Sequence, residues 1–300
     1  MIPELDPNTI LMVEVGSTAH GTGRSGQEDH DETAVQVETP EQVLGLSEGL
    51  RNKMYRTQPE GTQSGPGDTD RQVYSLRSFL KLAASGNPSI MLVLWAPIEH
   101  TTHLGDFLRA LGPKFIGRHM IARYRGYMQS QAMRLLGTKG GGHGVRGGGG
   151  RPELIEKYGY DTKYAMHVLR LAKQGFEFAT TGRMTLPMPE ADRLEVMRVR
   201  RGEFSLDDTL GLIRNAELRL EEANRSCTLP DQADKAAINE FMVQTYRSWW
   251  RNFGWNYDVR APRLRSTVRL GGGRNKSIST VGFPLAASRQ NLRSPCRTMS

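Results

Sequence analysis

Short apolar runs and alternating segments predict two strands near the N-terminus. Residues 10–15 are apolar except for one glutamate and lead into Gly16-Ser17, a pattern typical of a buried strand that ends in a tight turn. In an extended segment over residues 29–37, every second side chain, at positions 29, 31, 33, 35 and 37, shares one face. This segment predicts a second strand that carries Asp29 and Asp31 on the same face.

The next segments predict one helix between two extended pieces. Residues 47–69 are rich in glycine and polar residues and are typical of a loop, and residues 70–74 predict a short extended segment. A helix is expected from Ser75, with Gly86-Asn87-Pro88 as its stop. The apolar residues 89–95 predict another buried strand. Because strands and a helix alternate, this part of the chain predicts a small mixed sheet.

Apolar residues recur at helical spacing in much of the remaining chain. Helices are predicted over residues 120–135, 164–172, 206–223 and 232–250. Between the first two lie residues 137–150, which include nine glycines among fourteen positions. Ordering so many glycines is too costly in conformational entropy for a regular element, so this segment predicts a mobile loop or linker. The second half of the chain is therefore expected to be helical.

The composition is that of a folded protein rather than a disordered or fibrous one. The chain has 300 residues, of which 37% are hydrophobic and 24% are charged. Its longest apolar run, around residues 90–98, is far shorter than the roughly 20 residues that a membrane span needs. Two cysteines, Cys227 and Cys296, are too few for a disulfide framework. These features predict a cytoplasmic protein without a membrane segment.

The formal net charge of +8 belongs to the C-terminal end of the chain. Residues 260–300 hold nine Lys or Arg and no acid, so residues 1–259 carry a net charge of −1. Large apolar residues are few in this end, which predicts a disordered basic tail. A solvated appendage is the favoured interpretation, and an arm that binds polyanions through clustered arginines is the alternative.

A Gly-Ser turn and two aspartates are the first candidates for chemistry. The turn at Gly16 and Ser17 lets backbone N–H groups and a hydroxyl approach phosphate oxygens without a bulky side chain in the way. Asp29 and Asp31 present their carboxylates on one face of a strand, where they can hold Mg²⁺ together. His30 lies between them and is expected to point to the other face. The pattern favours a phosphate and metal site, with two exposed acids in a surface turn as the alternative.

A second set of candidates recurs along the predicted helix near residue 163. Lys163, His167, Arg170 and Gln174 follow at i, i+4, i+7 and i+11 and therefore form one stripe. A cationic stripe that faces an acidic metal site can bind a triphosphate. From spacing alone, an ordinary solvent-exposed helix face explains the same residues equally well.

The order of these features resembles the nucleotidyltransferase superfamily that includes DNA polymerase beta. That order is a strand, a Gly-Ser turn, a strand with Asp-x-Asp, and a third carboxylate on a later strand. More closely, the chain resembles a family of predicted nucleotidyltransferases found in bacteria and often in phages, some of them associated with RNA repair. The resemblance covers roughly residues 10–225. Its residues are Gly16-Ser17 through Gly21, Asp29-x-Asp31, residues 74–80 with Gly86-Asn87-Pro88, and residues 158–163 with His167 and Arg170-Leu171.

The resemblance implies a metal site made of three carboxylates. Asp29 and Asp31 would bind Mg²⁺ or Mn²⁺, and Asp70 would be the third carboxylate, with Asp68 as the alternative. In such a two-metal mechanism an acceptor hydroxyl attacks the α-phosphate of a nucleotide in line, and pyrophosphate leaves.

The resemblance also implies a binding site for the triphosphate of an incoming NTP. Gly16 and Ser17 would hold the β- and γ-phosphates. Lys163, His167 and Arg170 would steady the same group from the helix.

One departure from the family concerns the strand predicted over residues 89–95. Family members often place a Glu there, whereas this chain has Met91, Leu92 and Val93. This leaves a catalytically degenerate regulator of the same fold, which binds nucleotide or RNA, as the alternative function. A third hypothesis is an accessory protein that binds nucleic acid through the basic tail.

The sequence thus predicts an α/β (α+β) protein in three parts. Residues 1–103 would form the nucleotidyltransferase core around a small mixed sheet, residues 104–258 a helical domain, and residues 259–300 the disordered basic tail. The expected activity is transfer of a nucleoside monophosphate from an NTP to a hydroxyl acceptor. An RNA or DNA end, a protein side chain and a small molecule remain open as acceptors, and so does the oligomeric state.

Overall fold

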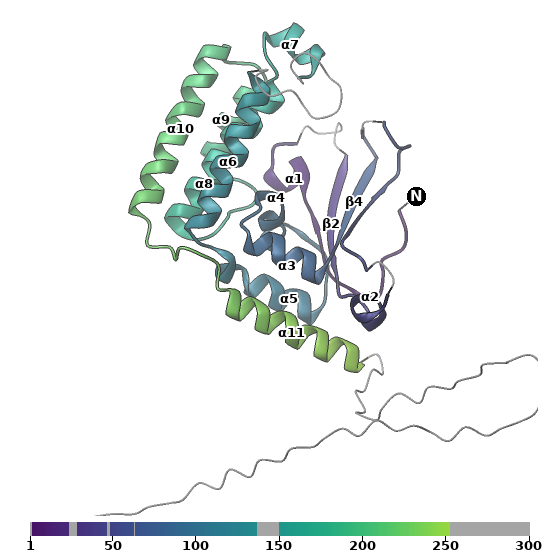
Figure 1. The fold of residues 1–300 in the computed structure, drawn as a ribbon. Coiled ribbons are helices and arrows are strands. Elements are labelled where there is room, and N and C mark those ends of the chain that lie inside the picture. The colour runs from purple at the N-terminus through teal and green to yellow at the C-terminus, as the bar shows by residue number, and fades with distance from the viewer. Residues whose placement is uncertain (1, 24–28, 47–48, 63, 137–149, 253–300) are drawn as a thin grey trace, which may run out of the picture. The chain divides into compact units, whose positions relative to one another are not determined.

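A five-stranded mixed sheet with helices packed against it makes up the described part of the protein (Figure 1). The structure is a computed structural model and describes residues 2–23, 29–46, 49–62, 64–136 and 150–252. These residues fall within one compact unit. The predicted fold class, a small mixed sheet followed by a helical region, is confirmed.

The sheet has the strand order β3-β4-β2-β1-β5. β2 runs parallel to β4, and every other neighbouring pair is antiparallel. Three strands confirm the predictions from residues 10–15, 29–37 and 70–74. The strands are β1 (Thr9–Glu14), β2 (His30–Gln36), β3 (Asn52–Arg56), β4 (Thr69–Ser75) and β5 (Ile98–Thr101).

The prediction of a loop over residues 47–69 is wrong in part, because β3 lies within it. β3 is an edge strand that pairs with β4 alone. Four of its five side chains are exposed, and Tyr55 is half-buried. A strand without a buried face lacks the hydrophobic alternation by which strands are recognised in a sequence. The residues of β3 therefore do not by themselves predict that it pairs with β4.

The strand predicted over residues 89–95 is wrong. The chain instead forms α4 (Pro88–Met91) and the 3₁₀ helix η1 (Leu92–Leu94), and β5 follows them. The side chain of Asn87 accepts hydrogen bonds from the backbone N–H groups of Ser89 and Ile90, and Pro88 occupies the first helical position. A short apolar run fits a buried helix as well as a strand, and here the cap selects the helix. The departure from the family noted in the sequence concerned a Glu on a strand over residues 89–95. Because this segment is helical, that comparison no longer applies.

The helical spacing of the sequence identifies the long helices correctly. The helix expected from Ser75 is α3, and the four helices predicted in the second half are α6, α8, α10 and α11. The helices around the sheet are α1 (Gly16–His20), α2 (Pro40–Leu44), α3 (Leu76–Ala84), α5 (His103–Ala110) and the 3₁₀ helix η2 (Gly112–Phe115). The later helices are α6 (Arg118–Leu135), α7 (Pro152–Tyr158), α8 (Thr162–Thr181), α9 (Glu190–Arg200), α10 (Leu206–Ser226) and α11 (Lys235–Asn252).

One hydrophobic cluster joins the sheet to the helices. It runs from Val13 and Val35 on the strands through Phe79 on α3 to Tyr124 and Phe178 on α6 and α8. α8 is the central helix of the second half and packs against α6, α9 and α10, while α11 packs on α3 (Figure 1). Because the cluster includes residues on both sides of position 103, the boundary proposed there stays a prediction.

Trp250 near the end of α11 is a packing residue. Its indole is buried and donates a hydrogen bond to the backbone oxygen of Glu38 at 2.8 Å. The basic tail and the glycine-rich segment over residues 137–149 lie outside the described residues. Among the described helices, none is long and apolar enough to cross a membrane.

Candidate active site

Three aspartates meet where β2 and β4 run side by side. Asp31 and Asp70 are register partners in this parallel pair, so both side chains stand on the same face of the sheet. Asp29 precedes β2 by one residue and stands two positions before Asp31. One carboxylate oxygen from each aspartate lies within 4.8 Å of the others. The structure thus brings the three predicted carboxylates into one cluster.

Gly16 lies directly against this cluster. It follows β1 and opens α1 with a φ of +72°, a conformation that favours glycine. A Cβ atom placed on Gly16 would lie 2.1 Å from Oδ2 of Asp31. No residue with a side chain fits there without displacing the carboxylate, so the glycine keeps the backbone of the turn close to the acidic cluster.

The electrostatics of the cluster suit a bound cation. Burial raises the pKa of Asp31 to about 6, and the charges of Asp29 and Asp70 act in the same direction. Such a set of carboxylate oxygens, held close together and repelling one another, matches the ligands that Mg²⁺ and Mn²⁺ prefer. The residues present therefore fit the metal that the sequence predicts.

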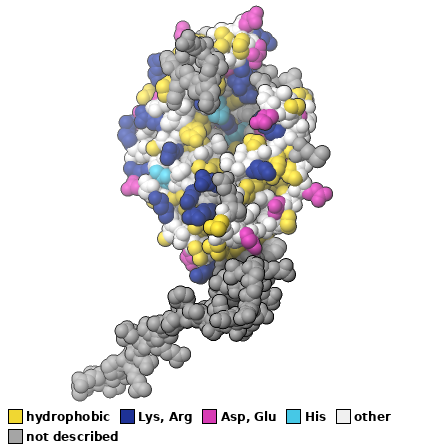
Figure 2. Space-filling model, turned by 45° about the vertical axis from the view of Figure 1, so that its right-hand side comes forward, with side chains coloured by type: hydrophobic (Ala, Val, Ile, Leu, Met, Phe, Trp, Pro, Cys, Tyr) yellow, Lys and Arg dark blue, Asp and Glu magenta, His cyan; other side chains and the backbone are white. Residues whose placement is uncertain are grey.

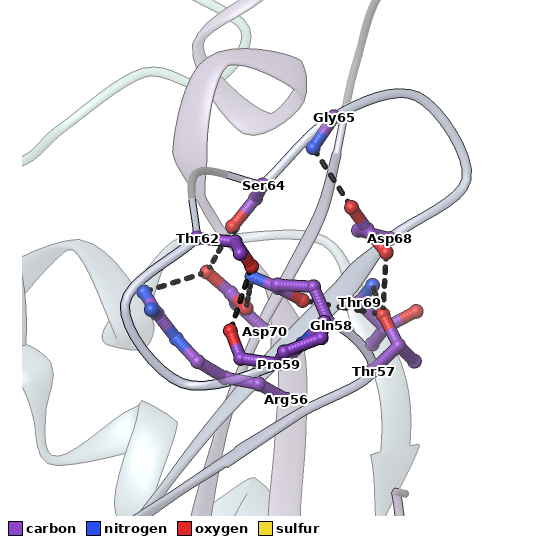
Figure 3. Close-up of polar contacts among 10 residues, drawn as sticks. All are labelled: Arg56, Thr57, Gln58, Pro59, Thr62, Ser64, Gly65, Asp68, Thr69 and Asp70. Carbon is purple, nitrogen blue, oxygen red and sulfur yellow. Dashed lines mark hydrogen bonds and ion pairs between the residues drawn. The ribbon is translucent and has the colours of Figure 1, made fainter.

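Asp70 is held by side chains from β3 and from the connection between β3 and β4 (Figure 3). Its carboxylate accepts hydrogen bonds from Gln58 Nε2 at 2.9 Å and Ser64 Oγ at 2.7 Å, and it pairs with Arg56 at 3.2 Å. Asp70 is buried, so these contacts satisfy a carboxylate that water reaches poorly.

Asp68, the alternative third carboxylate, lies differently (Figure 3). It accepts hydrogen bonds from Thr57 Oγ1 and from the backbone N–H of Gly65, both at 2.9 Å. It shapes the connection between the two strands and does not line the cavity that contains Asp29 and Asp31. By position, Asp70 is the better candidate of the two.

The N-terminal half of α8 forms the opposite wall. Asp161 fixes the start of this helix, because its carboxylate accepts hydrogen bonds from the backbone N–H groups of Lys163 and Tyr164 at 2.9 and 3.0 Å. Lys163, one turn before His167, lies near the aspartates: burial and neighbouring arginines lower the pKa of its ammonium, and the charges of Asp29 and Asp31 oppose that shift.

Arg170 is a half-buried cation without a counter-ion in the described part of the chain. Its Nε–H is buried and has no acceptor there, and its Nη2 donates to His167 Nδ1 at 2.8 Å. Burial lowers the pKa of Arg170 to about 10, so the guanidinium stays charged at neutral pH. A charge drawn partly out of water is costly unless an anion accompanies it, and this one lines the same cavity as the aspartates.

His167 is neutral and has a defined tautomer. Burial lowers the pKa of His167 to about 3, assisted by the charges of Arg170 and Lys163. Because a guanidinium only donates hydrogen bonds, Nδ1 of His167 is the acceptor and Nε2 carries the proton. His167 can therefore donate a hydrogen bond to a ligand without adding a charge.

His20, which no pattern in the sequence indicates as a site residue, also lines the cavity. His20 is buried at the end of α1, and its Nδ1 lies 3.1 Å from Gln174 Nε2 on α8. Burial lowers the pKa of His20 well below its usual value, so this ring is neutral as well. The contact ties the turn after Gly16 to the helix that carries Arg170. Gln174 belongs to the predicted stripe, but no local signal links it to His20.

These walls enclose a cavity of about 520 Å³, within the usual size of a small-molecule site. Figure 2 shows histidine side chains within a hollow of the face drawn there. Apolar and aromatic side chains also line the cavity, among them Met54, Tyr74, Pro88, Ile90, Leu92 and Tyr127. All eight predicted site residues line the cavity, namely Gly16, Ser17, Asp29, Asp31, Asp70, Lys163, His167 and Arg170.

His30 points to the other face of the sheet, as expected. Its ring lies 2.7 Å from a carboxylate oxygen of Glu99 and 3.1 Å from one of Glu32, and it does not line the cavity. His30 is therefore a partner of these glutamates rather than of Asp29 and Asp31.

Comparison with known proteins agrees with this geometry. A model of the RNA repair pathway DNA polymerase beta family, RlaP, matches residues 3–244, which include every candidate residue of the cavity. No curated protein matches the chain. Among solved structures the chain is similar to a nucleotidyltransferase-like protein from Exiguobacterium sibiricum 255-15, at 11% identity and a TM-score of 0.28, over 81% of this chain and 75% of that one. That likeness is too low to carry an argument, and the family match stands by itself. Because this match spans most of the chain, the protein belongs to the RNA repair pathway DNA polymerase beta family, a family of nucleotidyltransferases.

Proposed function

We propose that this protein transfers a nucleoside monophosphate from an NTP to a hydroxyl group of an acceptor. The observation that carries the proposal is the meeting, in one cavity, of three carboxylates and a half-buried arginine that has no carboxylate partner among the described residues. An acidic cluster needs a cation, and an isolated guanidinium needs an anion. A metal-bound triphosphate supplies both.

The cavity offers a place for each part of an NTP. The triphosphate would lie between the turn at Gly16-Ser17 and the side chains of Lys163 and Arg170, where N–H groups, a hydroxyl and two cations meet it. The nucleoside would lie against apolar and aromatic side chains of the lining, which include Tyr74 and Tyr127. Stacking on an aromatic side chain accepts any base, so this arrangement supports binding more than base selection.

Asp29, Asp31 and Asp70 would hold the metal, Mg²⁺ or Mn²⁺. When bound, such ions neutralise phosphate charge and lower the pKa of a nearby hydroxyl. The aspartates contribute fixed oxygen ligands, and Gly16 allows the phosphates to approach them, since any larger residue would meet Asp31.

The reaction exchanges one phosphorus–oxygen bond for another. The acceptor oxygen would form a bond to the α-phosphorus, the bond from that phosphorus to the bridging oxygen of the β-phosphate would break, and pyrophosphate would leave with that electron pair. The hydroxyl proton passes to solvent. Lys163 and Arg170 would stabilise the charge that grows on the leaving group, and neutral His167 would donate a hydrogen bond through Nε2.

The acceptor is proposed to be the end of an RNA or DNA strand. The family description refers to an RNA repair pathway. A nucleic-acid end carries the required hydroxyl, and repair chemistry supplies such ends.

The test is incubation of the purified protein with each α-labelled NTP, excess Mg²⁺ and RNA, DNA or protein acceptors. Asp29→Ala/Asp31→Ala is expected to lose at least about a thousandfold in transfer rate, as expected when metal ligands are removed. Glu153→Ala/Glu156→Ala removes the same charge from two exposed positions of α7 and is expected to keep full activity. Transfer by the first variant at the unmutated rate would refute the assignment.

The third carboxylate is tested by comparing Asp70→Asn with Asp68→Asn. Asp70→Asn is expected to abolish transfer while NTP binding persists. Asp68→Asn is expected to retain transfer, because its side chain contacts Thr57 and Gly65 rather than the cavity. The reverse result would exchange the two roles.

A regulator that binds nucleotide without turnover is the second candidate. One observation favours it: the carboxylate of Asp70 is engaged by Arg56, Gln58 and Ser64, so this acid is not free for a metal as it stands. The same assay separates the two functions. NTP binding without release of pyrophosphate would identify the regulator.

A further inference from the structure

A second cavity, of about 500 Å³, opens between α3, α6 and α11. We call it the α3–α6–α11 groove. Each helix contributes one cation to its lining, namely Lys81, Arg123 and Lys235, and no acidic residue lines it. All three cations are exposed, and none forms an ion pair with a carboxylate of the described residues. The groove therefore presents unneutralised positive charge.

The helices that form the groove are more positively charged than residues 1–259 as a whole. The three helices hold nine Lys or Arg and a single acid, Glu240, whereas residues 1–259 as a whole carry a net charge of −1. Two of the nine, Arg118 and Arg125, lie outside the groove and pair with acids of neighbouring elements. A local excess of this kind attracts a partner with regularly repeated negative charges.

The floor of the groove is apolar. Leu80, Ile238 and Met242 line it beneath the cations. A polyphosphate has no apolar group that could bind to such a floor, whereas an unpaired nucleobase is a flat, weakly polar group that can. The combination of cationic rim and apolar floor thus suits a nucleotide unit.

His119 adds a flat ring to the same lining. Its Nε2 donates to the backbone oxygen of Ala84 at 3.0 Å, which fixes the ring and leaves Nδ1 unprotonated. Burial lowers the pKa of His119, and Lys235 and Arg123 act in the same direction, so the ring is neutral at neutral pH. A neutral, oriented imidazole is a surface on which a base can stack.

The groove adjoins the candidate active site. Arg123 lines the groove and Tyr127 lines the active-site cavity, one turn further along α6. The ring hydroxyl of Tyr127 accepts a hydrogen bond from Asn87 Nδ2 at 3.1 Å, which holds the tyrosine side chain in place. An α-helix rises about 6 Å over four residues, so a chain that leaves the groove has a short distance to cross.

We propose that the α3–α6–α11 groove binds a single-stranded nucleic acid, with phosphates on Lys81, Arg123 and Lys235 and a base on the apolar floor. The strand passes Tyr127 and delivers its terminal hydroxyl to the carboxylate cluster, as the acceptor of the transfer. This acceptor role rests on the proposed function. Binding of the strand does not, and it can be measured separately.

The test compares the binding of labelled single-stranded RNA and DNA oligonucleotides by two full-length variants. Lys81→Gln/Arg123→Gln/Lys235→Gln is expected to bind both about 50-fold more weakly at physiological salt and to lower the salt slope of log K by about two, because three phosphate contacts are lost. Lys157→Gln/Arg183→Gln/Arg214→Gln removes the same charge from exposed positions outside the groove and is expected to bind as the unmutated protein does.

Two further arms test the base and the acceptor role. An oligonucleotide of abasic units is expected to bind at least about tenfold more weakly than the same strand with bases, since stacking contributes roughly 1–3 kcal/mol per base. In the transfer assay the groove variant is expected to raise the KM for the nucleic acid and leave the KM for NTP unchanged.

The outcomes separate this inference from the proposed function. Equal affinity of the groove variant and its charge-matched control would overturn the groove as the binding site. Equal affinity for abasic and intact strands would overturn base recognition. The Asp29→Ala/Asp31→Ala variant is expected to bind RNA normally, because its substitutions lie outside the groove. If the unmutated protein bound strands through the groove but transferred no nucleotide, the proposed function would be refuted and the groove would remain a binding site.

Discussion

Asp31 on β2 and Asp70 on β4 are register partners across a parallel strand pair, and burial together with the charges of Asp29 and Asp70 raises the pKa of Asp31 to about 6. A carboxyl group whose folded pKa lies above its usual value of 3.8 contributes stability when protonated. That contribution is complete below about pH 4 and is lost as the pH rises through about 6. At neutral pH the ionised Asp31 therefore destabilises the metal-free protein.

The first prediction concerns Asp31→Asn, which stays neutral at every pH. In the presence of a chelator at neutral pH, this variant is expected to be more stable than the unmutated protein. A shift of about two pKa units corresponds to roughly 3 kcal/mol, which the partial exposure of the side chain reduces to about 1 kcal/mol. Thermal unfolding at neutral pH measures the difference.

The same comparison near pH 4 is its internal control, because both proteins then carry a neutral side chain and are expected to unfold alike. Excess Mg²⁺ is expected to stabilise the unmutated protein and to leave Asp31→Asn nearly unchanged. A variant that is less stable than the unmutated protein at neutral pH would contradict the electrostatic account.

The second prediction concerns Gly16→Ala. The φ of +72° makes any side chain strained, and the new Cβ would lie 2.1 Å from Oδ2 of Asp31. We expect a loss of about 1–2 kcal/mol in the free energy of unfolding and a loss of at least about tenfold in Mg²⁺-dependent NTP binding. Calorimetry and thermal unfolding measure the two effects.

Gly182→Ala is the matched control for this variant. Gly182 has a φ of +66° at the end of α8, and its nearest neighbour would be Leu229 Cδ2 at 3.9 Å. The control shares the backbone strain but not the contact with a carboxylate, so it is expected to lose stability and keep NTP binding. Normal NTP binding by Gly16→Ala would show that the close approach to Asp31 does not matter.

The third prediction concerns Arg170→Met, which replaces a half-buried charge by an apolar side chain of similar length. Because Arg170 has no counter-ion among the described residues, we expect unchanged or increased stability of the free protein. We expect NTP affinity to fall by about 10- to 100-fold, which corresponds to the roughly 1.5–3 kcal/mol of a hydrogen bond to a charged group. Equilibrium binding of labelled NTP measures it.

Lys173→Met, one turn further along α8, is the control. Lys173 pairs with Asp192 and Glu195 on α9, both at 2.6 Å. Its replacement leaves two carboxylates without their cation, so it is expected to destabilise the protein and to leave NTP affinity intact. If both variants behaved alike, Arg170 would be a structural cation rather than part of a phosphate site.

The sequence predicts those parts of the site that depend on local spacing. Asp29 and Asp31 stand two apart, which puts their side chains on one face of a strand, and Lys163, His167 and Arg170 follow the helical period. These relationships are set by backbone geometry within one element, so the structure keeps them.

Tertiary contacts account for what the sequence does not reveal. The pairing of His20 with Gln174 joins helices far apart in the chain, and no local pattern encodes it. β3 is specified by its neighbour β4 rather than by its own exposed side chains. Residues 88–94 carry an apolar run that two structures fit, and the cap at Asn87 selects the helix.

The last prediction concerns Gln58→Ala/Ser64→Ala, which removes two hydrogen bonds from Asp70 (Figure 3). In a chelator the buried carboxylate loses partners that water replaces poorly, so we expect a loss of about 1–3 kcal/mol in the free energy of unfolding. A metal bound to Asp70 would satisfy the same oxygens. Excess Mg²⁺ is therefore expected to recover most of the loss. Thr57→Ala removes a hydrogen bond to Asp68 in the same connection, and its effect is expected to be independent of Mg²⁺. Equal losses by the Gln58/Ser64 variant with and without Mg²⁺ would mean that Asp70 does not bind the metal.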